Sequence, residues 1–198
     1  MALATERVVS ANRQLAVQLD PAPIEAPSLA DRFTESFGRW AELASARQRG
    51  HDLEWLPAWA QRNLAGLAEL EAGWASAATG DALCHCDLRA DNLLLTEHEV
   101  VVVDWPWASI GAAWFDGVAM VPSLIMQGAP DWQPLLERYF DALEAPPDGV
   151  SAVLAALAGF FLYWAHQPAE PGLPTLPAFQ RAQGEAAIDW LRIRTGWH

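Results

Sequence analysis

The sequence predicts a mainly helical α+β fold that contains a small β-hairpin. Apolar side chains recur at helical spacing through most of the chain, and two short apolar runs, 93–95 and 100–103, flank a short polar turn. The 198 residues, of which 52% are hydrophobic, are enough to bury one sizeable core. These observations together indicate a helical body with a small β region set into one face.

Three helices are predicted before residue 80. The apolar periodicity places them at residues 4–19, from about 28 to 44, and from about 57 to 74. Prolines between residues 21 and 27 form a short, stiff connector after the first helix. Ser28 with Asp31 three residues later resembles a capping box, and Pro57 fits the first turn of a helix.

The chain changes character at Gly80 and Asp81, which interrupt the helical period before a short apolar strand. Four more helices are expected after the hairpin, at residues 113–126, 131–143, 149–165 and 177–193. A loop rich in proline and glycine, 167–174, separates the last two. The region after the hairpin is therefore expected to be mainly helical.

The acidic composition limits the classes of partner. Asp and Glu number 25 against 12 Lys and Arg, and the resulting formal charge of −13 disfavours nucleic acid and anionic membrane as partners. It would suit a cationic substrate, although solubility is the commoner reason for an acidic surface. No signal-peptide pattern marks the N-terminus, and the longest apolar stretch, 150–164, contains Ser151 and Gly159. We interpret this stretch as a buried helix rather than a membrane span.

Cys84 and Cys86 are expected two residues apart on one strand, where the geometry does not favour a disulfide. With His85 between them they resemble part of a zinc site. The sequence has no second Cys or His pair to complete such a site. Free thiols fit a reducing cytoplasm, which is the predicted location.

Three polar residues surround the predicted hairpin. The hairpin leaves Asn92 and returns toward it, so we expect Asp104 to lie close to Asn92. Amide and carboxylate oxygens there would suit Mg²⁺, which takes few protein ligands and keeps positions for water and phosphate. Asp87, on the preceding loop, could accept a hydroxyl proton or orient the hydroxyl for attack. The alternatives are a solvated loop carboxylate for Asp87, a turn residue for Asn92 and a strand-end cap for Asp104.

The pattern His85-x-Asp87-x-x-x-x-Asn92 followed by Asp104 resembles the catalytic loop and metal-binding Asp of the aminoglycoside phosphotransferase family. These are small-molecule kinases with a protein-kinase-like fold. The resemblance implies a catalytic Asp87 and Mg²⁺ coordination by Asn92 and Asp104 beside ATP. It also implies that His85 supports the loop, and that Asp116, at the start of the next helix, braces it.

Further candidates near this motif carry alternatives. Arg89 could contact a phosphate or an acidic substrate group, or it could pair with Asp91 at the surface. Trp105 and Trp107 could line the cleft against a sugar or an adenine ring, although core packing is the default in a chain with 11 Trp.

Three positions depart from the family pattern. Cys86 stands where the family often has Gly, residues 111–113 read Gly-Ala-Ala in place of a common Gly-Asp-Pro, and Gly117 replaces an apolar residue. None of these changes removes a catalytic atom.

The resemblance covers the C-terminal lobe of the kinase-like fold. It implies that residues 1–27 correspond to the helix and connector that follow the N-terminal lobe, and that residues 28–198 form the helical lobe, with the catalytic loop at 85–92. The nucleotide-covering β-lobe is expected to be absent, because no strand-rich region or GxG arrangement precedes residue 80 and the sequence contains no Lys.

The implied function is an ATP- and Mg²⁺-dependent phosphotransferase that acts on a hydroxyl of a small molecule and is impaired by the missing lobe. One alternative is a catalytically silent remnant that binds a small molecule or a protein. A second is a fragment of a longer kinase. For the remnant, exposed Trp105 and Trp107 would favour self-association through the face left by the lobe.

Overall fold

The computed structural model describes residues 2–198 and shows a mainly helical protein with two small antiparallel sheets. The helices are α1 (Ala2–Gln18), α2 (Leu29–Phe33), α3 (Arg39–Gln48), α4 (Ala58–Arg62), α5 (Leu64–Glu71), α6 (Trp74–Ala77), α7 (Phe115–Met126), α8 (Trp132–Ala142), α9 (Pro147–Ala165) and α10 (Leu176–Thr195). The strands are β1 (Ala82–Cys84), β2 (Leu93–Leu95), β3 (Val100–Val102) and β4 (Ser109–Gly111), and a 3₁₀ turn, η1, spans Ala90–Asn92.

The core is built around the pair α9 and α10. Helix α9 is apolar on nearly all sides, and its residues from Ala152 to Ala158 are all buried. Gly184 of α10 lets the two helices approach closely, because a Cβ there would lie 2.7 Å from Cγ of Leu162. Helix α9 is long and apolar enough to cross a membrane, but its packing inside the protein is that of a core helix. The structure therefore confirms the interpretation of 150–164 as a buried helix.

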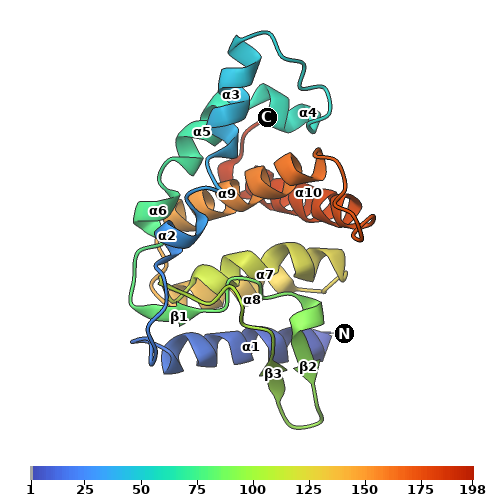
Figure 1. Ribbon diagram of the computed structural model, residues 1–198. Helices are drawn as coiled ribbons and strands as arrows, with labels where there is room; N and C mark the ends of the chain where they lie inside the picture. Colours follow the sequence, from blue (N-terminus) through green and yellow to red (C-terminus); the bar gives the residue numbers. More distant parts are fainter. Residues whose placement is uncertain (1) are drawn as a thin grey trace.

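The helices stack on both sides of this central pair (Figure 1). Helix α7 packs against α10 and α9, and α1 lies across α7 and α8. On the opposite side, α3 and α5 pack against each other and against α9. Both sheets lie on the α1 and α7 side of the molecule, so the segment of chain between β1 and α7 occupies one edge of the stack.

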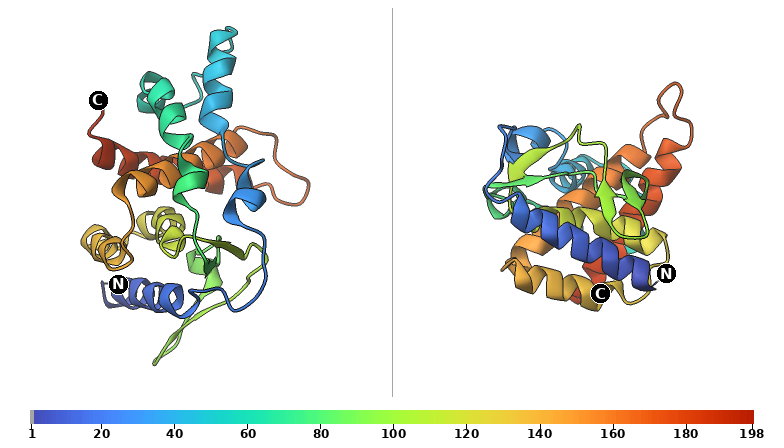
Figure 2. Two further views of the ribbon diagram at one scale, coloured as in Figure 1. Left: turned by 90° about the vertical axis from the view of Figure 1, so that its left-hand side faces the viewer. Right: turned by 90° about the horizontal axis from the view of Figure 1, so that it is seen from below.

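The hairpin forms as the sequence predicts. Strands β2 and β3 pair antiparallel with Leu93 opposite Val102 and Leu95 opposite Val100. The hairpin projects away from the helices (Figures 1 and 2). Arg7 of α1 ties its turn to the body of the protein, because the guanidinium donates to the carbonyl of Thr96 at 2.7 Å and to that of Glu99 at 3.2 Å.

Two predicted helices prove to be divided. The expected helix 28–44 ends at Phe33 and restarts at Arg39, because Phe37 turns inward between them to pack its ring against Trp74 at 4.8 Å. The expected helix 57–74 is divided into α4, α5 and α6, with breaks at Asn63 and after Glu71. In both segments helices form where the apolar spacing predicts them, but the prediction of one continuous helix is wrong.

The strand assignment also needs two corrections. Cys86 does not lie on a strand, because β1 ends at Cys84 and Cys86 adopts a left-handed backbone with φ of 69°. Strand β4 was not predicted, and it pairs antiparallel with β1 so that Ala82 lies opposite Gly111. This pairing brings the chain after the hairpin back beside the start of the loop that carries Asp87.

Candidate active site

The loop after β1 is held by one carboxylate from the first turn of α7. Asp116 accepts a hydrogen bond from the backbone N–H of His85 at 2.6 Å and a second from that of Cys86 at 2.8 Å. The side chain is buried, and burial raises its pKa although the two N–H donors oppose the shift. A loop anchored in this way at two consecutive N–H groups has little freedom to move at Asp87.

His85 joins the loop to the end of the hairpin. Its Nδ1 accepts the backbone N–H of Asp87 at 3.2 Å, so its Nε2 carries the proton and donates to the carbonyl of Val103 at 3.0 Å. Trp105 packs edge-on against the imidazole, with ring centroids 4.7 Å apart. With both nitrogens engaged and only 1% of its surface exposed, His85 holds the loop in place.

Two hydrogen bonds to Asp87 orient the side chain of Asn92. Its Nδ2 donates to the backbone carbonyl of Asp87 at 2.8 Å and to Oδ2 of the same residue at 3.2 Å. Both partners are acceptors, so the amide nitrogen must face Asp87 and the amide oxygen must face away from it. The Asp87 carboxylate is half-buried, and burial raises its pKa, while Arg89 and the Asn92 amide oppose the rise.

Asp104 comes shortly after β3, and its backbone lies close to that of Asn92. The N–H of Val103 donates to the carbonyl of Asn92 at 3.0 Å, which places the next residue, Asp104, beside the start of the hairpin. Asp104 is exposed and has a left-handed backbone with φ of 65°, a conformation that is uncommon for a residue other than glycine and is often found at functional sites.

The donor set fits a magnesium ion that is shared with phosphate. No cluster of three or more His, Cys, Asp or Glu side chains suited to a metal occurs among residues 2–198. The Asn92 amide and the Asp104 carboxylate offer oxygen ligands of the kind that Mg²⁺ takes, and this ion commonly uses one or two protein oxygens when phosphates and water complete its shell.

A cavity of about 270 Å³ adjoins Asp87. Asp87, Arg89 and Trp107 contribute to its wall, together with residues of α9 and α10. Half of the lining residues are aromatic: Phe33, Phe37, Trp107, Phe115, Phe160, Phe161, Trp164 and Phe179. Asp87 is the only carboxylate in this wall.

The remaining predicted residues divide between the cavity and the core. Arg89 lies 3.0 Å from Asp91 and 3.5 Å from Asp87, so it pairs with both carboxylates. Trp107 is 48% exposed at the cavity. Trp105 does not line the cavity, because its indole N–H donates to the carbonyl of Val102 and its ring covers His85. Trp105 is therefore only partly exposed.

Sequence reasoning missed most of the cavity wall. The aromatic residues come from segments as far apart as Phe33 and Phe179, and only Trp107 was named as a candidate for the cleft. One signal was present in α10, where Leu176, Phe179, Gln180 and Gln183 follow helical spacing. A stripe in which two glutamines accompany two apolar residues is typical of a face that meets something other than a dry core.

The family model described as "Phosphotransferase enzyme family" matches residues 5–160. Among solved structures, the chain is similar to a choline/ethanolamine kinase family protein from Mesorhizobium loti, with 18% identity and a TM-score of 0.56. The match covers 96% of this chain and 62% of that one, and it shows a shared fold. No curated protein sequence matches the chain significantly.

Proposed function

This chain belongs to the phosphotransferase enzyme family, and we propose that it takes part in transfer of the γ-phosphoryl group of ATP to a hydroxyl of a small molecule. The observation that carries the proposal is the arrangement at Asp87. One carboxylate faces an aromatic-lined cavity on one side and the Asn92 amide on the other, on a loop that Asp116 fixes.

Each residue has a distinct part in the proposed reaction. Asp87 would orient the attacking hydroxyl and receive its proton, and the raised pKa of the carboxyl favours that acceptance. Asn92 and Asp104 would hold Mg²⁺ through their oxygens, and the ion, when bound, would neutralise charge on the phosphates. His85 and Asp116 would keep these groups in register, because transfer of this kind depends mainly on positioning.

We further propose that the described residues correspond to the C-terminal lobe of the kinase-like fold, with the helix and connector at 1–27 and the lobe at 28–198. The 62% coverage of the solved structure and the presence of two-stranded sheets alone among residues 2–198 support this view. No Lys is present in the 198 residues to pair with the nucleotide phosphates. We therefore expect these residues alone to transfer phosphate slowly.

A cytoplasmic location is part of the same proposal. The two cysteines at the site are free thiols, which agrees with a reducing compartment. ATP is abundant in that compartment, so the location and the proposed reaction are compatible.

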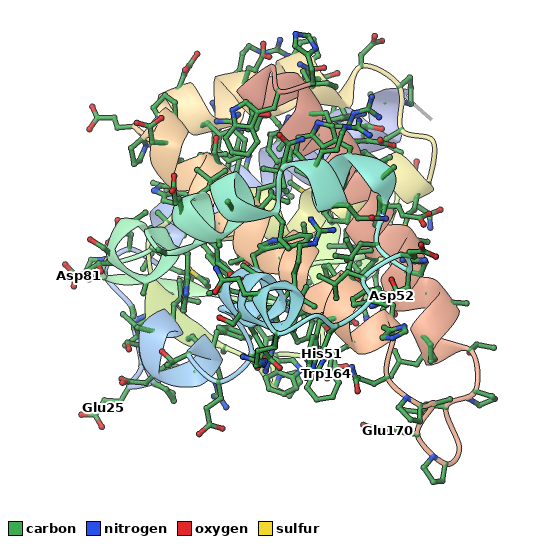
Figure 3. The ribbon with its side chains drawn as sticks, turned by 90° about the horizontal axis from the view of Figure 1, so that it is seen from above. Glu25, His51, Asp52, Asp81, Trp164 and Glu170 are labelled. Carbon is green, nitrogen blue, oxygen red and sulfur yellow. The ribbon has the colours of Figure 1, made fainter. Side chains whose placement is uncertain are left out.

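The test is calorimetric titration of the protein with ATP and Mg²⁺. We expect binding that is lost in Asp104→Ala and retained in Asp81→Ala, a matched change at an aspartate that lies at the periphery of the molecule (Figure 3). Binding that is equal in all three proteins would show that Asp104 has no part in holding the metal. Absence of binding in the unmodified protein would favour the alternative of a silent binding module.

A further inference from the structure

The cavity beside Asp87 has a wall whose chemistry narrows the class of ligand. It is lined by eight aromatic rings and contains two charged side chains, Asp87 and Arg89. These two lie 3.5 Å apart, so the single carboxylate of the wall already has a cationic partner. A cavity of about 270 Å³ with this lining suits one flat apolar ring that carries small substituents.

Three of the rings already have a guanidinium near their faces. Arg89 lies 5.5 Å from the ring centre of Phe179, and the corresponding distance is 5.9 Å both for Arg39 with Trp164 and for Arg32 with Trp107. A ring attracts a cation through its negative face, and here the protein supplies that cation. An aromatic wall would otherwise suit a cationic ligand, but three of these eight rings already have an arginine near one face.

The charges around the wall balance one another. Arg39 pairs with Glu42 at 2.7 Å and Arg89 with two aspartates, while Arg32 forms no ion pair within residues 2–198. The wall therefore has no excess of carboxylates that would attract a cation.

Gln183 provides a polar group that lacks a partner. The side chain is 3% exposed and lines the cavity from α10, and its Oε1 has no hydrogen-bond partner among the described residues. A buried acceptor without a donor destabilises the protein. A ligand N–H or O–H in the cavity would remove that cost.

We propose that this cavity binds a neutral aromatic alcohol, with its hydroxyl at Asp87 and an N–H group at its far end donating to Oε1 of Gln183. The assignment of the hydroxyl rests on the proposed phosphotransferase function. The neutral, aromatic and N–H-bearing character rests on the wall, the arginines and Gln183. A molecule with several ammonium groups would find no free carboxylate in this wall.

The experiment compares three benzyl alcohols that differ only in their para group, by calorimetric titration at pH 7 without ATP or Mg²⁺. The probes are 4-(hydroxymethyl)benzamide, which is neutral with N–H donors, 4-(aminomethyl)benzyl alcohol, which is cationic, and 4-(hydroxymethyl)benzoate, which is anionic. We expect the amide to bind about tenfold more tightly than either charged probe, which corresponds to about 1.4 kcal/mol. Equal or tighter binding of the cation, or no binding of any probe, would overturn the proposal.

A variant of Gln183 tests the predicted contact. Gln183→Leu should weaken binding of the amide about tenfold, while Gln48→Leu, at an exposed position on α3, should leave it unchanged. Circular dichroism establishes that each variant is folded. An unchanged affinity of Gln183→Leu would contradict the assignment.

The two proposals can fail separately. Asp104 does not line the cavity, so Asp104→Ala should lose ATP and Mg²⁺ while it keeps the amide probe. Probe binding without ATP binding in the unmodified protein would retain the cavity assignment and reject the phosphotransferase. ATP binding without probe binding would do the reverse.

Discussion

Gly117 lies where the ring of Tyr139 leaves no room for a side chain. A Cβ at this position would lie 2.2 Å from Cε1 of Tyr139. Tyr139 has little freedom to move, because it is 1% exposed and its hydroxyl donates to the carbonyl of Ala113 at 3.3 Å. The departure of this position from the family pattern therefore has a steric cause, and it lies next to the carboxylate of Asp116.

Gly117→Ala should destabilise the protein by about 1–3 kcal/mol through overpacking against Tyr139. Thermal denaturation followed by circular dichroism should show a melting temperature lower by several degrees. Gly73→Ala is the matched control, since a Cβ there would meet no atom closer than 3.8 Å. Equal melting temperatures for Gly117→Ala and Gly73→Ala would refute the steric account.

At the scale of elements, the start of α3 depends on a carboxylate from the end of α5. Glu71 accepts the backbone N–H groups of Gly38 at 2.9 Å, Arg39 at 3.1 Å and Trp40 at 2.9 Å. These are donors that the first turn of a helix leaves unpaired. Glu71 is 1% exposed, and burial raises its pKa from 4.5 to about 7 although the N–H donors oppose the rise.

The raised pKa of Glu71 predicts a pH-dependent stability. Between pH 4.5 and 7 the folded protein retains a proton that the unfolded chain releases, so the free energy of unfolding should fall as the pH rises, by about 3 kcal/mol from this residue. Urea denaturation at pH 4.5 and 7.5 measures the change. Glu71→Gln should remove this part of the dependence, while Glu69→Gln, at an exposed position on the same helix, should keep it. Identical pH dependences in the two variants would exclude Glu71 as the source.

At the scale of the whole molecule, the surrounding protein makes both cysteine thiols unreactive. Cys84 is 2% exposed, and Cys86 lies at the cavity. Burial raises the pKa of each thiol, and the nearby Asp116 carboxylate raises it further. Because the thiolate is the reactive form, neither cysteine should act as a nucleophile in the native protein.

Alkylation by iodoacetamide at pH 7.5 should therefore be slow in the native protein and fast in urea, with rates that differ on the order of 100-fold. Mass spectrometry of the intact protein measures the labelling. A Cys84→Ala variant assigns the signal to Cys86. Labelling of Cys86 in the native protein at the rate of a free thiol would contradict the predicted rise in its pKa.

The whole molecule also shows what could be predicted from the sequence. The hairpin and the proximity of Asn92 to Asp104 were predictable, because they depend on pairing within a dozen residues. The break after Phe33 and the strand β4 were not, because Phe37 packs on Trp74 and β4 pairs with β1, contacts that join distant segments. The cavity could not be predicted for the same reason. Helical spacing shows that one face of a helix is apolar, but it does not show which segment that face packs against.

The packing of α1 has a consequence during synthesis on the ribosome. Its buried residues Val8, Val9 and Ala16 face α7 and α8, and α8 ends at Ala142, 124 residues after the end of α1. At about 5–20 residues per second, the apolar face of α1 waits roughly 6–25 s for its partners to emerge. During that interval the nascent chain exposes an amphipathic helix that a chaperone can bind.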